Sequence, residues 1–455
     1  MRIAVGQMPG TALGGWRETL ALLARLSAQA AEGGADIVVL PEGAWPAYVL
    51  GSKAAYRAAR AGGMPPPVEF LARMQAVAQA ARIAVCVGHV EETESPAAGM
   101  PELRNAVSFI NPDGHLAGTR HKCFLWDFDH AYYSPGERVA PVDTALGRVG
   151  MLVCADARLP EMAATLIARG AQVLVQPTAW VNAGTPEAPW NPQPEFLIPS
   201  RAAEFHVPFA SASKWGAEGA GAFVGGSLIC GADGRVLVRC DPDETGVRLA
   251  EVTVGETRRP ILTADERAYL LRVGPAAPTR ADVPPLRVSV AKAAAAGVCD
   301  RSDPTPGEPE LIIVRSEDGL RPPARRLIGR RAFLSAPAPD VFELRGIRIG
   351  ALAAGDAGRF AAARRLALEG AHVIVFFGDA PMMMLQSRAC ENRVFVVAAA
   401  ATGVRAFDPR GLPVGAGVSG ENAREVLLDV SAAAGKVVAP GTDVIAGRRT
   451  ELYEF

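Results

Sequence analysis

The sequence has no excess of charge of either sign. Its 47 lysines and arginines stand against 48 aspartates and glutamates, which gives a formal net charge of −1. Nucleic acids and anionic membrane surfaces bind clusters of positive charge, so this balance argues against both as partners. Long apolar runs are also scarce: the longest, at residues 394–401, is far shorter than the roughly 18 residues of a membrane helix and predicts a buried strand.

The sequence also lacks the cysteine pattern of a disulfide framework. Seven cysteines are scattered along 455 residues, and an odd, irregular set is not typical of paired cysteines. The first residues alternate as in a strand, without the charged and apolar segments of a secretion signal. We therefore expect a protein of a reducing compartment, the cytoplasm.

What the sequence does contain is an alternation of strand and helix signals over its first 255 residues. Apolar residues recur at helical spacing in residues 16–29 and 67–81, and apolar runs at 37–40 and 83–89 predict buried strands. The NPDG sequence at residues 111–114 is a hairpin turn signal. This order predicts an α/β domain with mixed sheets that helices cover, and such folds place their sites where strands end in loops.

Cys154 lies where a strand signal ends and a helix signal begins. Residues 148–153 form a short apolar run, and the helix pattern starts at Pro160 and stops at Gly170. Free backbone N–H groups and the helix dipole at such a position favour a thiolate, and they can stabilise the oxyanion formed when it attacks a carbonyl. Cys154 is therefore a candidate nucleophile, although an inert buried cysteine fits the same position.

Two charged residues could serve a cysteine nucleophile. Glu42 follows the apolar run at 37–40, where a carboxylate could enter a cleft and accept the thiol proton. Lys122 follows the hairpin signal, where an ammonium could stabilise developing negative charge. Taken singly, Glu42 is more simply read as a helix-start or loop carboxylate, and Lys122 as a solvated surface lysine.

Three longer motifs contain these residues. They are LPEGAWPAY at residues 40–48, RHKCFLWDFDHAYYSPGE at 120–137 and CADARLPE at 154–161. In this order and at this spacing they resemble the signatures of the nitrilase superfamily of carbon–nitrogen hydrolases. Further matches within residues 1–255 are PTAW at 177–180, RAAEF at 201–205 and GGSLICGADGRVL at 225–237.

The resemblance implies a four-layer α-β-β-α sandwich with a Glu–Lys–Cys triad. Carried onto this sequence, Glu42 is the general base and Cys154 is the nucleophile that forms a thioester acyl-enzyme. Lys122 would stabilise the tetrahedral intermediate, and the backbone N–H of Ala155 would be a second donor to the oxyanion. The resemblance implies no metal ion and no organic cofactor.

The sequence departs from the family pattern beside the lysine. Many members have a second glutamate before a proline–glycine turn, and here Asp129, one methylene shorter, is the nearest match. The family's frequent histidine two residues after the lysine is Phe124. Trp126, Trp180 and His130 are candidate pocket residues, although the two tryptophans need no function to explain their presence in a core.

The residues after the nucleophile point to one branch of the family. True nitrilases commonly have Trp-Glu there, whereas ADAR at residues 155–158 resembles the amidase and carbamoylase branches. The resulting hypothesis is hydrolysis of a C–N bond in a small-molecule amide or N-carbamoyl compound. Three alternatives stay open: a catalytically silent binding or assembly protein, acyl transfer to an amine, and hydrolysis of a nitrile.

The second half of the chain partly repeats the first. GIRIGALAAGDAGRFAAARRLALEGAHVIVF at residues 346–376 aligns with the stretch from Gly147 at a shift of 200, which places Ala354 on Cys154. Shorter matches pair Arg388 and Glu391 with Arg201 and Glu204, Glu317 with Glu42, and Arg331 with Lys122. The predicted domains are a catalytic domain at residues 1–257, a linker at 258–285, and a truncated, degenerate copy at 286–455.

The copy should be inert, because alanine cannot attack a carbonyl and arginine does not readily donate a proton. The resemblance also suggests why such a copy could be kept, since domains of this family usually pair face to face through their outer helices. A fused copy could supply the second face and make the chain an intramolecular pseudo-dimer. A homo-oligomer, or a regulatory appendage, is the alternative.

Overall fold

The chain folds into two compact units in the computed structural model. Unit 1 comprises Met1–Pro260, Ala439–Thr442 and Glu451–Phe455, and unit 2 comprises Ile261–Val438 and Asp443–Thr450. The residues that the structure describes are 1–93, 101–272, 282–292, 311–315, 325–328, 331–334, 337–400, 403–415 and 425–455.

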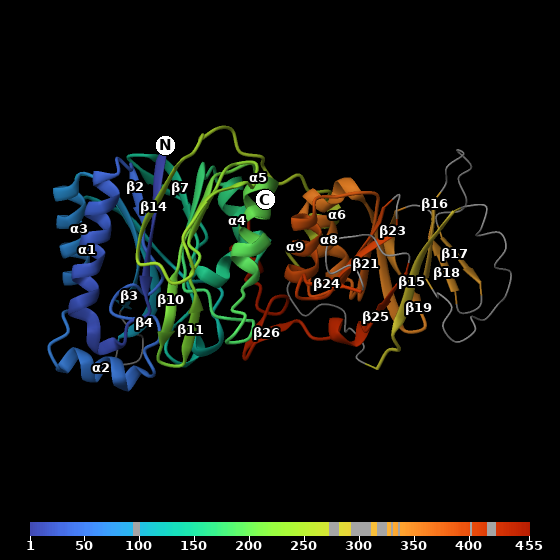
Figure 1. Ribbon diagram of the computed structural model, residues 1–455, viewed down its shortest axis with the longest axis horizontal. Helices are drawn as coiled ribbons and strands as arrows, with labels where there is room; N and C mark the ends of the chain where they lie inside the picture. The colour runs from blue at the N-terminus through green and yellow to red at the C-terminus, as the bar shows by residue number, and fades with distance from the viewer. Residues whose placement is uncertain are drawn as a thin grey trace. The chain divides into compact units, whose positions relative to one another are not determined.

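Unit 1 is a stack of two sheets between two pairs of helices (Figure 1). One sheet has the strand order β11-β10-β1-β2-β3-β4-β5, with β14 also paired to β1, and the other has the order β13-β12-β9-β8-β7-β6. Helices α1 and α3 cover the first sheet, and α4 and α5 cover the second. This is the α-β-β-α order of layers that the family resemblance implies.

The strands of unit 1 are β1 (Arg2–Pro9), β2 (Ile37–Val39), β3 (Ala84–Thr93), β4 (Glu102–Ile110), β5 (Leu116–His121), β6 (Val142–Thr144), β7 (Gly147–Met151), β8 (Val173–Pro177), β9 (Phe209–Ala212), β10 (Lys214–Glu218), β11 (Gly221–Val224), β12 (Leu228–Cys230), β13 (Val236–Arg239) and β14 (Gly246–Glu251). Its helices are α1 (Trp16–Glu32), α2 (Lys53–Ala61), α3 (Pro67–Ala81), α4 (Pro160–Ala168) and α5 (Ile198–Phe205), with shorter turns η1 (Leu13–Gly15), η2 (Asp127–Ala131), η3 (Cys154–Arg158) and η4 (Gln193–Leu197).

Helix α3 shows how local sequence determines these elements. Pro67 stands in the first turn, where its missing N–H costs no hydrogen bond, and Arg82 ends the helix in the left-handed conformation with φ of 53°. Phe70, Met74 and Ala78, spaced by four, form the buried face of the helix. Because these side chains join the core beneath the helix, packing of this apolar stripe stabilises the helix more than propensity does.

Two segments differ from what the sequence pattern indicates. The glycines in residues 216–226 are typical of a loop, but a loop prediction is wrong here: the segment forms the hairpin of β10 and β11, with Gly219 at φ of 58° in its turn. Helix α2 has no counterpart among the predicted elements. Only Tyr56 of its residues is buried, and its other apolar residues are alanines, which give a weak apolar signal.

Unit 1 is completed by segments that come after unit 2 in the sequence. The backbone N–H of Glu454 donates to the Thr165 hydroxyl of α4 at 3.2 Å, and the Glu454 carboxylate pairs with Arg169 at 2.8 Å. Tyr453 beside them is 8% exposed. The sequence pattern contains no signal for this return of the chain to the first unit.

Unit 2 also contains two sheets, with helices beside one of them (Figure 1). The strand orders are β19-β20-β21-β22-β23-β24 and β17-β18-β16-β15-β25, and apolar residues from both sheets form one core. Within the described residues, helices cover only the first of these sheets. The elements are α6 (Ala264–Leu270), β15 (Leu286–Lys292), β16 (Leu311–Arg315), β17 (Arg325–Ile328), β18 (Arg331–Leu334), β19 (Ala338–Leu344), β20 (Ile347–Ala353), η5 (Ala354–Gly358), α8 (Phe360–Leu368), β21 (Val373–Phe377), α9 (Met382–Asn392), β22 (Phe395–Ala400), β23 (Gly403–Phe407), β24 (Pro413–Val414), β25 (Glu425–Leu428) and η6 (Val430–Ala433), followed by β26 (Val437–Ala439), β27 (Thr442–Asp443) and η7 (Thr450–Leu452).

Several elements of the two units occur at the spacing of the sequence repeat. The bounds of η5, α8 and β21 are those of η3, α4 and β8 shifted by 200 residues. The matched residues of α5 and α9 also form matching buried ion pairs, Arg201 with Glu204 and Arg388 with Glu391. Glu317, which the alignment matches to Glu42, lies outside the described residues.

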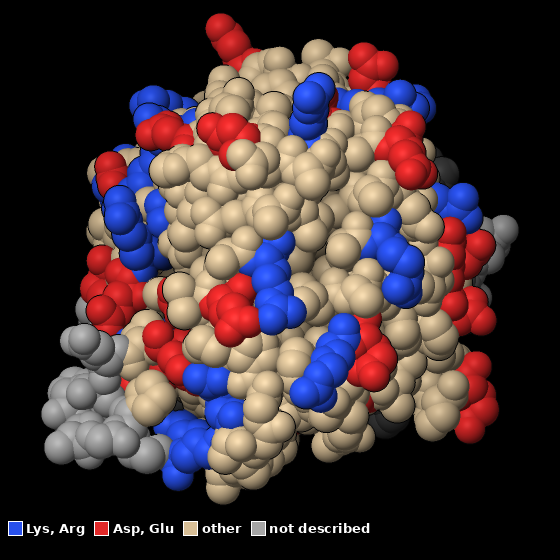
Figure 2. Space-filling view, turned by 90° about the vertical axis from the view of Figure 1, so that its left-hand side faces the viewer, with Lys and Arg blue, Asp and Glu red and all other residues tan. Residues whose placement is uncertain are grey.

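The surface of unit 1 carries charges of both signs where α1 and α3 form its outer face. Figure 2 shows lysine and arginine side chains interspersed with aspartate and glutamate around a large area of other residues. Mixed charge of this kind produces no strong field of one sign on that face. Across the described residues, every helix is too short or too polar to cross a lipid bilayer.

Candidate active site

Glu42 follows β2 and is held by neighbours from three separate parts of the chain. Its Oε1 accepts hydrogen bonds from Asn105 Nδ2 and Lys122 Nζ, each at 2.7 Å, and its Oε2 accepts one from the Ala179 backbone N–H at 3.0 Å. The carboxylate is fully buried. Gly88 of β3 lies so close that a Cβ there would be 2.6 Å from the Glu42 Cα. Only glycine fits at this position of the strand.

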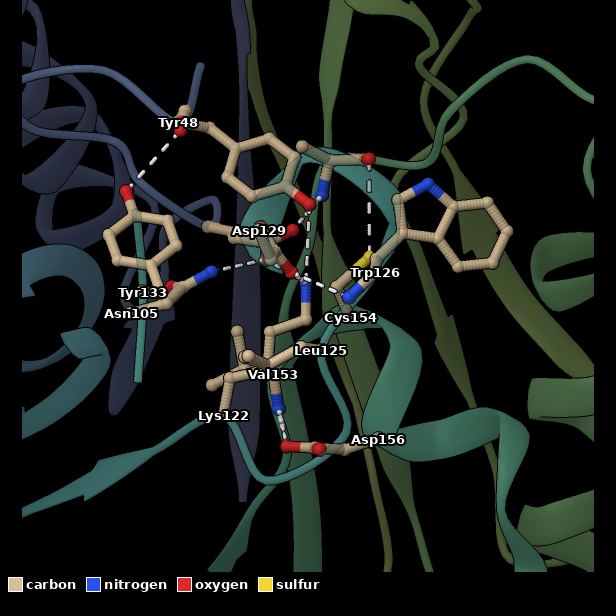
Figure 3. A network of polar contacts seen from close by, with 12 residues as sticks. Tyr48, Asn105, Lys122, Leu125, Trp126, Asp129, Tyr133, Val153, Cys154 and Asp156 are labelled. Carbon is tan, nitrogen blue, oxygen red and sulfur yellow. Dashed lines mark hydrogen bonds and ion pairs between the residues drawn. The ribbon is translucent and has the colours of Figure 1, made fainter. Parts of the chain in front are cut away.

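Lys122 stands just past β5 with its ammonium between two carboxylates (Figure 3). Its Nζ lies 2.7 Å from Glu42 Oε1, 2.6 Å from Asp129 Oδ2 and 3.2 Å from the Tyr48 hydroxyl. An ammonium has three N–H donors, and these partners account for all of them. The side chain is fully buried, so its charge is fixed in place and screened little by water.

Asp129 reaches the lysine from η2, a single turn held by its own hydrogen bonds. The Asp129 carboxylate accepts from the Trp126 backbone N–H at 2.9 Å, and the Asp129 N–H donates to the Trp126 carbonyl at 2.6 Å. The side chain is fully buried. Asp129, the residue that stands nearest to the family's second glutamate, thus contacts the lysine directly.

Cys154 begins η3 in a conformation that is unusual for a residue with a side chain. Its φ is 44°, in the left-handed region that favours glycine, and such strain is commonly found at functional sites. The Sγ lies 4.0 Å from the carbonyl of Ala179, the residue whose N–H holds Glu42. The residue is 5% exposed, so the sulfur is placed in a largely dry environment near the carboxylate.

Asp156 ties the lysine segment to the cysteine turn. Its Oδ1 accepts from the backbone N–H groups of Cys123 and Phe124 at 3.1 and 2.8 Å, and its Oδ2 accepts from that of Val153 at 3.0 Å. Cys123 and Phe124 follow Lys122 directly, and Val153 precedes Cys154 directly. One carboxylate therefore fixes the relative positions of two segments that carry functional side chains.

Burial and the neighbouring charges determine the protonation of the cluster. Burial raises the pKa of the Cys154 thiol to about 12, the charge of Glu42 adds to the rise, and Lys122 opposes it. Burial also raises the pKa of Glu42 above its ordinary value of 4.5, against the effect of Lys122. For Lys122, burial lowers the pKa, but the charges of Asp129 and Glu42 outweigh burial and raise the pKa above its ordinary value. The ammonium therefore stays protonated. The resting site thus contains a thiol and an ammonium, with the Glu42 carboxyl group beside them.

The two tryptophans proposed as pocket residues are both buried. Trp126 lies beside Cys154 (Figure 3), and the Arg158 guanidinium lies 4.8 Å from the centre of its ring. Trp180 is fully buried three residues after Pro177, the end of β8. Within the described part of the chain, neither indole N–H has a hydrogen-bond partner, so both could donate to a bound molecule.

Ala155 and His130 lie in different surroundings. Ala155 is fully buried in η3, directly after the cysteine, where its backbone N–H belongs to the first turn. His130 is exposed at the surface of η2, and a Cβ on Gly441 would lie 3.2 Å from its ring. The turn therefore directs Asp129 inward and His130 outward.

Two residues of the cluster were not singled out from the sequence. Tyr48 lies within the first motif, but its contact with Lys122 spans 74 positions in the chain. Asn105 lies in β4 and reaches Glu42 across 63 positions. Asn105 is 1% exposed, but its strand also contains Glu102, Arg104 and Ser108, so one more polar residue there gives no distinct signal in the sequence.

The known proteins that resemble this chain match mainly its first unit. The family model described as carbon–nitrogen hydrolase matches residues 2–259. A hydrolase encoded in the pqqF 5′ region of Pseudomonas protegens is 30% identical over 263 residues, which are 57% of this chain and 86% of that protein. An (R)-stereoselective amidase from a Pseudomonas species is 30% identical over 47% of this chain and 71% of its own length.

Other similarities are partial or more distant. A probable nitrilase of Schizosaccharomyces pombe is 28% identical, and this chain spans about half of it, 51% of its length. Among solved structures, a mutant of the amidase from Nesterenkonia sp. AN1, with acrylamide added at its active-site cysteine, is 25% identical. That match covers 56% of this chain and 93% of the other, with a TM-score of 0.45.

Proposed function

Because the chain belongs to the carbon–nitrogen hydrolase family, we propose that unit 1 hydrolyses a small amide or N-carbamoyl compound through a thioester at Cys154. Amide cleavage accords with the names of several relatives, among them the (R)-stereoselective amidase and an omega-amidase of Mus musculus that is 31% identical over 65% of its length. The substrate would reach the thiol in the same buried cluster that holds Glu42 and Lys122.

The first half of the reaction would form the acyl-enzyme. Glu42 accepts the proton of the Cys154 thiol as the sulfur attacks the carbonyl carbon, and the carbonyl oxygen becomes an oxyanion. The positive charge of Lys122 and the backbone N–H of Ala155 stabilise that oxyanion. When the tetrahedral intermediate collapses, the C–N bond breaks, Glu42 returns the proton to the nitrogen, and ammonia or an amine leaves.

The second half would release the acid. Glu42 removes a proton from a water molecule, which attacks the thioester carbon. Lys122 and the Ala155 N–H stabilise the second oxyanion. The C–S bond then breaks, and the sulfur takes the proton from Glu42 to restore the thiol. The products are a carboxylic or carbamic acid and the amine, so atoms and charge balance over the cycle.

The observation that carries this proposal is the buried ammonium of Lys122 between the carboxylates of Glu42 and Asp129. A thiol whose pKa is raised to about 12 is a poor nucleophile at neutral pH. A base must therefore take its proton during attack, and Glu42 is placed to do so beside Lys122, whose charge opposes the rise that burial causes in the pKa of Glu42. A cluster with this charge distribution supports acyl chemistry at sulfur better than an inert binding site.

The test is intact mass spectrometry of the whole chain incubated with a panel of amides, N-carbamoyl compounds and nitriles. We expect an acyl adduct on Cys154 with one class of substrate, and loss of both adduct and turnover in Cys154→Ala. Product analysis with and without an added amine distinguishes hydrolysis from acyl transfer. Turnover retained in Cys154→Ala would refute the mechanism, and absence of any adduct or product across the panel would favour a silent binding protein.

A further inference from the structure

The segment Ala439–Thr442 belongs to unit 1 and lies against the turn that carries Asp129. The Thr442 hydroxyl accepts a hydrogen bond from the Asp127 backbone N–H at 2.8 Å and lies 3.4 Å from the Leu125 carbonyl. Thr442 is 1% exposed. A buried hydroxyl from a distant part of the sequence therefore binds the backbone on both sides of Trp126.

Asp127 is a place where the backbone needs such a partner. Its φ is 35°, and a residue with a side chain adopts this conformation only when its surroundings hold it there. The Asp127 N–H donates to Thr442. The turn around Asp127 is closed by Asp129, whose carboxylate and N–H both bond the Trp126 backbone. Without the hydroxyl, a strained residue at the start of η2 would also lose the hydrogen bond of its N–H.

The turn determines where the Asp129 carboxylate meets the lysine. Asp129 Oδ2 lies 2.6 Å from Lys122 Nζ, and both side chains are fully buried. A carboxylate on a turn of five residues moves with the turn, and a charge pair in a dry site loses strength quickly when its geometry is disturbed. Lys122 in turn contacts Glu42, so a displacement of η2 reaches the proposed base and nucleophile.

We propose that Thr442 is a positioning residue for the active site. Its hydroxyl holds η2 through the hydrogen bond from the Asp127 amide, and this keeps Asp129 paired with Lys122. This inference rests on the function proposed above. It assigns a role in the reaction to a residue that follows the intervening 261–438 segment of unit 2. Thr442 lies outside the residues that match the family model, which end at 259.

The test compares Thr442→Val, which removes only the hydroxyl, with Thr442→Ser, which keeps it. The readouts are the rate of Cys154 alkylation by iodoacetamide, followed by peptide mass mapping, and kcat and KM with the substrate found above. We expect Thr442→Val to lower the alkylation rate and kcat about tenfold, as loss of a buried hydrogen bond predicts, with less change in KM. Thr442→Ser should remain within about twofold of the parent chain.

Two further variants separate positioning from general destabilisation. Thr19→Val removes another buried hydroxyl of unit 1, 1% exposed and bonded to the Gly15 carbonyl at 3.0 Å, and it should leave Cys154 alkylation unchanged. In an Asp129→Asn background, Thr442→Val should lower neither the Cys154 alkylation rate nor kcat any further, because the carboxylate that Thr442 positions is already gone. The proposal would be overturned if Thr442→Val lowered the alkylation rate as much in the Asp129→Asn background as in the parent chain. It would also be overturned if Thr442→Val alone left that rate unchanged.

A second route keeps the test valid if Thr442→Val folds poorly. Asp127→Gly removes the backbone strain at φ of 35°, since glycine adopts this region freely, so Asp127→Gly with Thr442→Val should recover part of the lost rate. No recovery in a folded double variant would contradict the assigned route through Asp127. Failure of the proposed function is a separate outcome: Cys154 of the parent chain would then be alkylated no faster than the buried Cys86 and Cys230.

Discussion

Asn105 supports the ionised form of the proposed base. Burial raises the pKa of Glu42 above 4.5, and the side-chain N–H of Asn105, which donates to Glu42 at 2.7 Å, opposes that rise together with Lys122. Since Glu42 must be ionised to accept the thiol proton, activity is lost as the pH falls through its pKa. We expect kcat/KM to show an acid limb above pH 4.5, and Asn105→Ala to shift that limb to higher pH.

A neighbouring variant provides the control for this shift. Ser108→Ala lies on the same strand and removes a buried hydroxyl that bonds His89 at 2.8 Å, without contact to Glu42. Its pH profile should match that of the parent chain. An acid limb that stays in place in Asn105→Ala, or moves to lower pH, would exclude Glu42 as the group that this limb reports.

Tyr48 is expected to support the charge of Lys122. Its hydroxyl is the only neutral partner of the ammonium among the described residues and lies 3.2 Å from it. Tyr48→Phe should lower kcat about fivefold, the effect of one ordinary hydrogen bond, while the fold stays intact. Tyr56→Phe, which removes a hydroxyl bonded to Glu92 at 2.9 Å, should leave kcat unchanged; equal kcat values in the two variants would deny Tyr48 this role.

The sequence identifies a residue when local pattern and chemistry coincide. Glu42, Lys122 and Cys154 follow strands and carry reactive groups, so their motifs locate them without a structure. Asn105 and Thr442 carry no such mark, because an amide in a strand and a hydroxyl in a short extended segment are common. Their significance arises from contacts across 63 and 315 positions of the chain, which only the tertiary structure creates.

The hairpin of β10 and β11 stabilises the segment that follows Glu42. Lys214 pairs with Glu218 at 2.6 Å and donates to the Gly43 carbonyl at 2.8 Å, and Glu218 accepts from the N–H groups of Tyr48 and Val49. Both charged side chains are fully buried. Lys214→Met leaves the carboxylate buried without its counter-charge and should lower the free energy of unfolding by about 3 kcal/mol.

Tryptophan fluorescence during urea unfolding measures this effect in unit 1 alone, because all six tryptophans lie within its first 260 residues. The control is Arg73→Met, which breaks the exposed pair with Glu69 on α3 and should cost less than about 1 kcal/mol. A loss in Lys214→Met no larger than in this control would mean that the buried pair does not stabilise the segment after Glu42.

Elements with strong end signals are the ones that the sequence predicts well. Helix α3 has the predicted bounds, 67–81, because a proline starts it and an apolar stripe runs through it. The β10–β11 hairpin escapes prediction because its glycines also suit a loop, and its buried Lys214 and Glu218 look like surface charges. Polar residues become buried there only because they bind one another and the backbone of another segment.

At the scale of the whole molecule, the repeat leads to a prediction about assembly. If the fused copy replaces the second subunit that domains of this family usually bind, the chain needs no partner. Sedimentation velocity should then give the mass of one chain at micromolar concentrations. A concentration-dependent dimer would contradict the pseudo-dimer hypothesis and favour the homo-oligomer.

The repeat was visible in the sequence because it preserves packing residues at constant spacing. The matching ion pairs of α5 and α9, and the shift of 200 residues between α4 and α8, follow from that preserved core. The return of Ala439–Thr442 and Glu451–Phe455 to unit 1 could not be predicted in the same way. These segments are short and have no periodic pattern, and their place depends on surfaces formed by residues far upstream.

That return has a consequence for how the protein is made. Proteins emerge from the ribosome in order of sequence and begin to fold as they emerge, so Cys154, Lys122 and Glu42 can come together long before Thr442 has been translated. Residues 261–438 must be synthesised first, and only then can the Asp127 amide find its hydroxyl. A nascent chain that stalls within that interval would hold Asp129 on a turn that lacks its hydrogen bond to Thr442, and the complete site would form only after translation has passed both units.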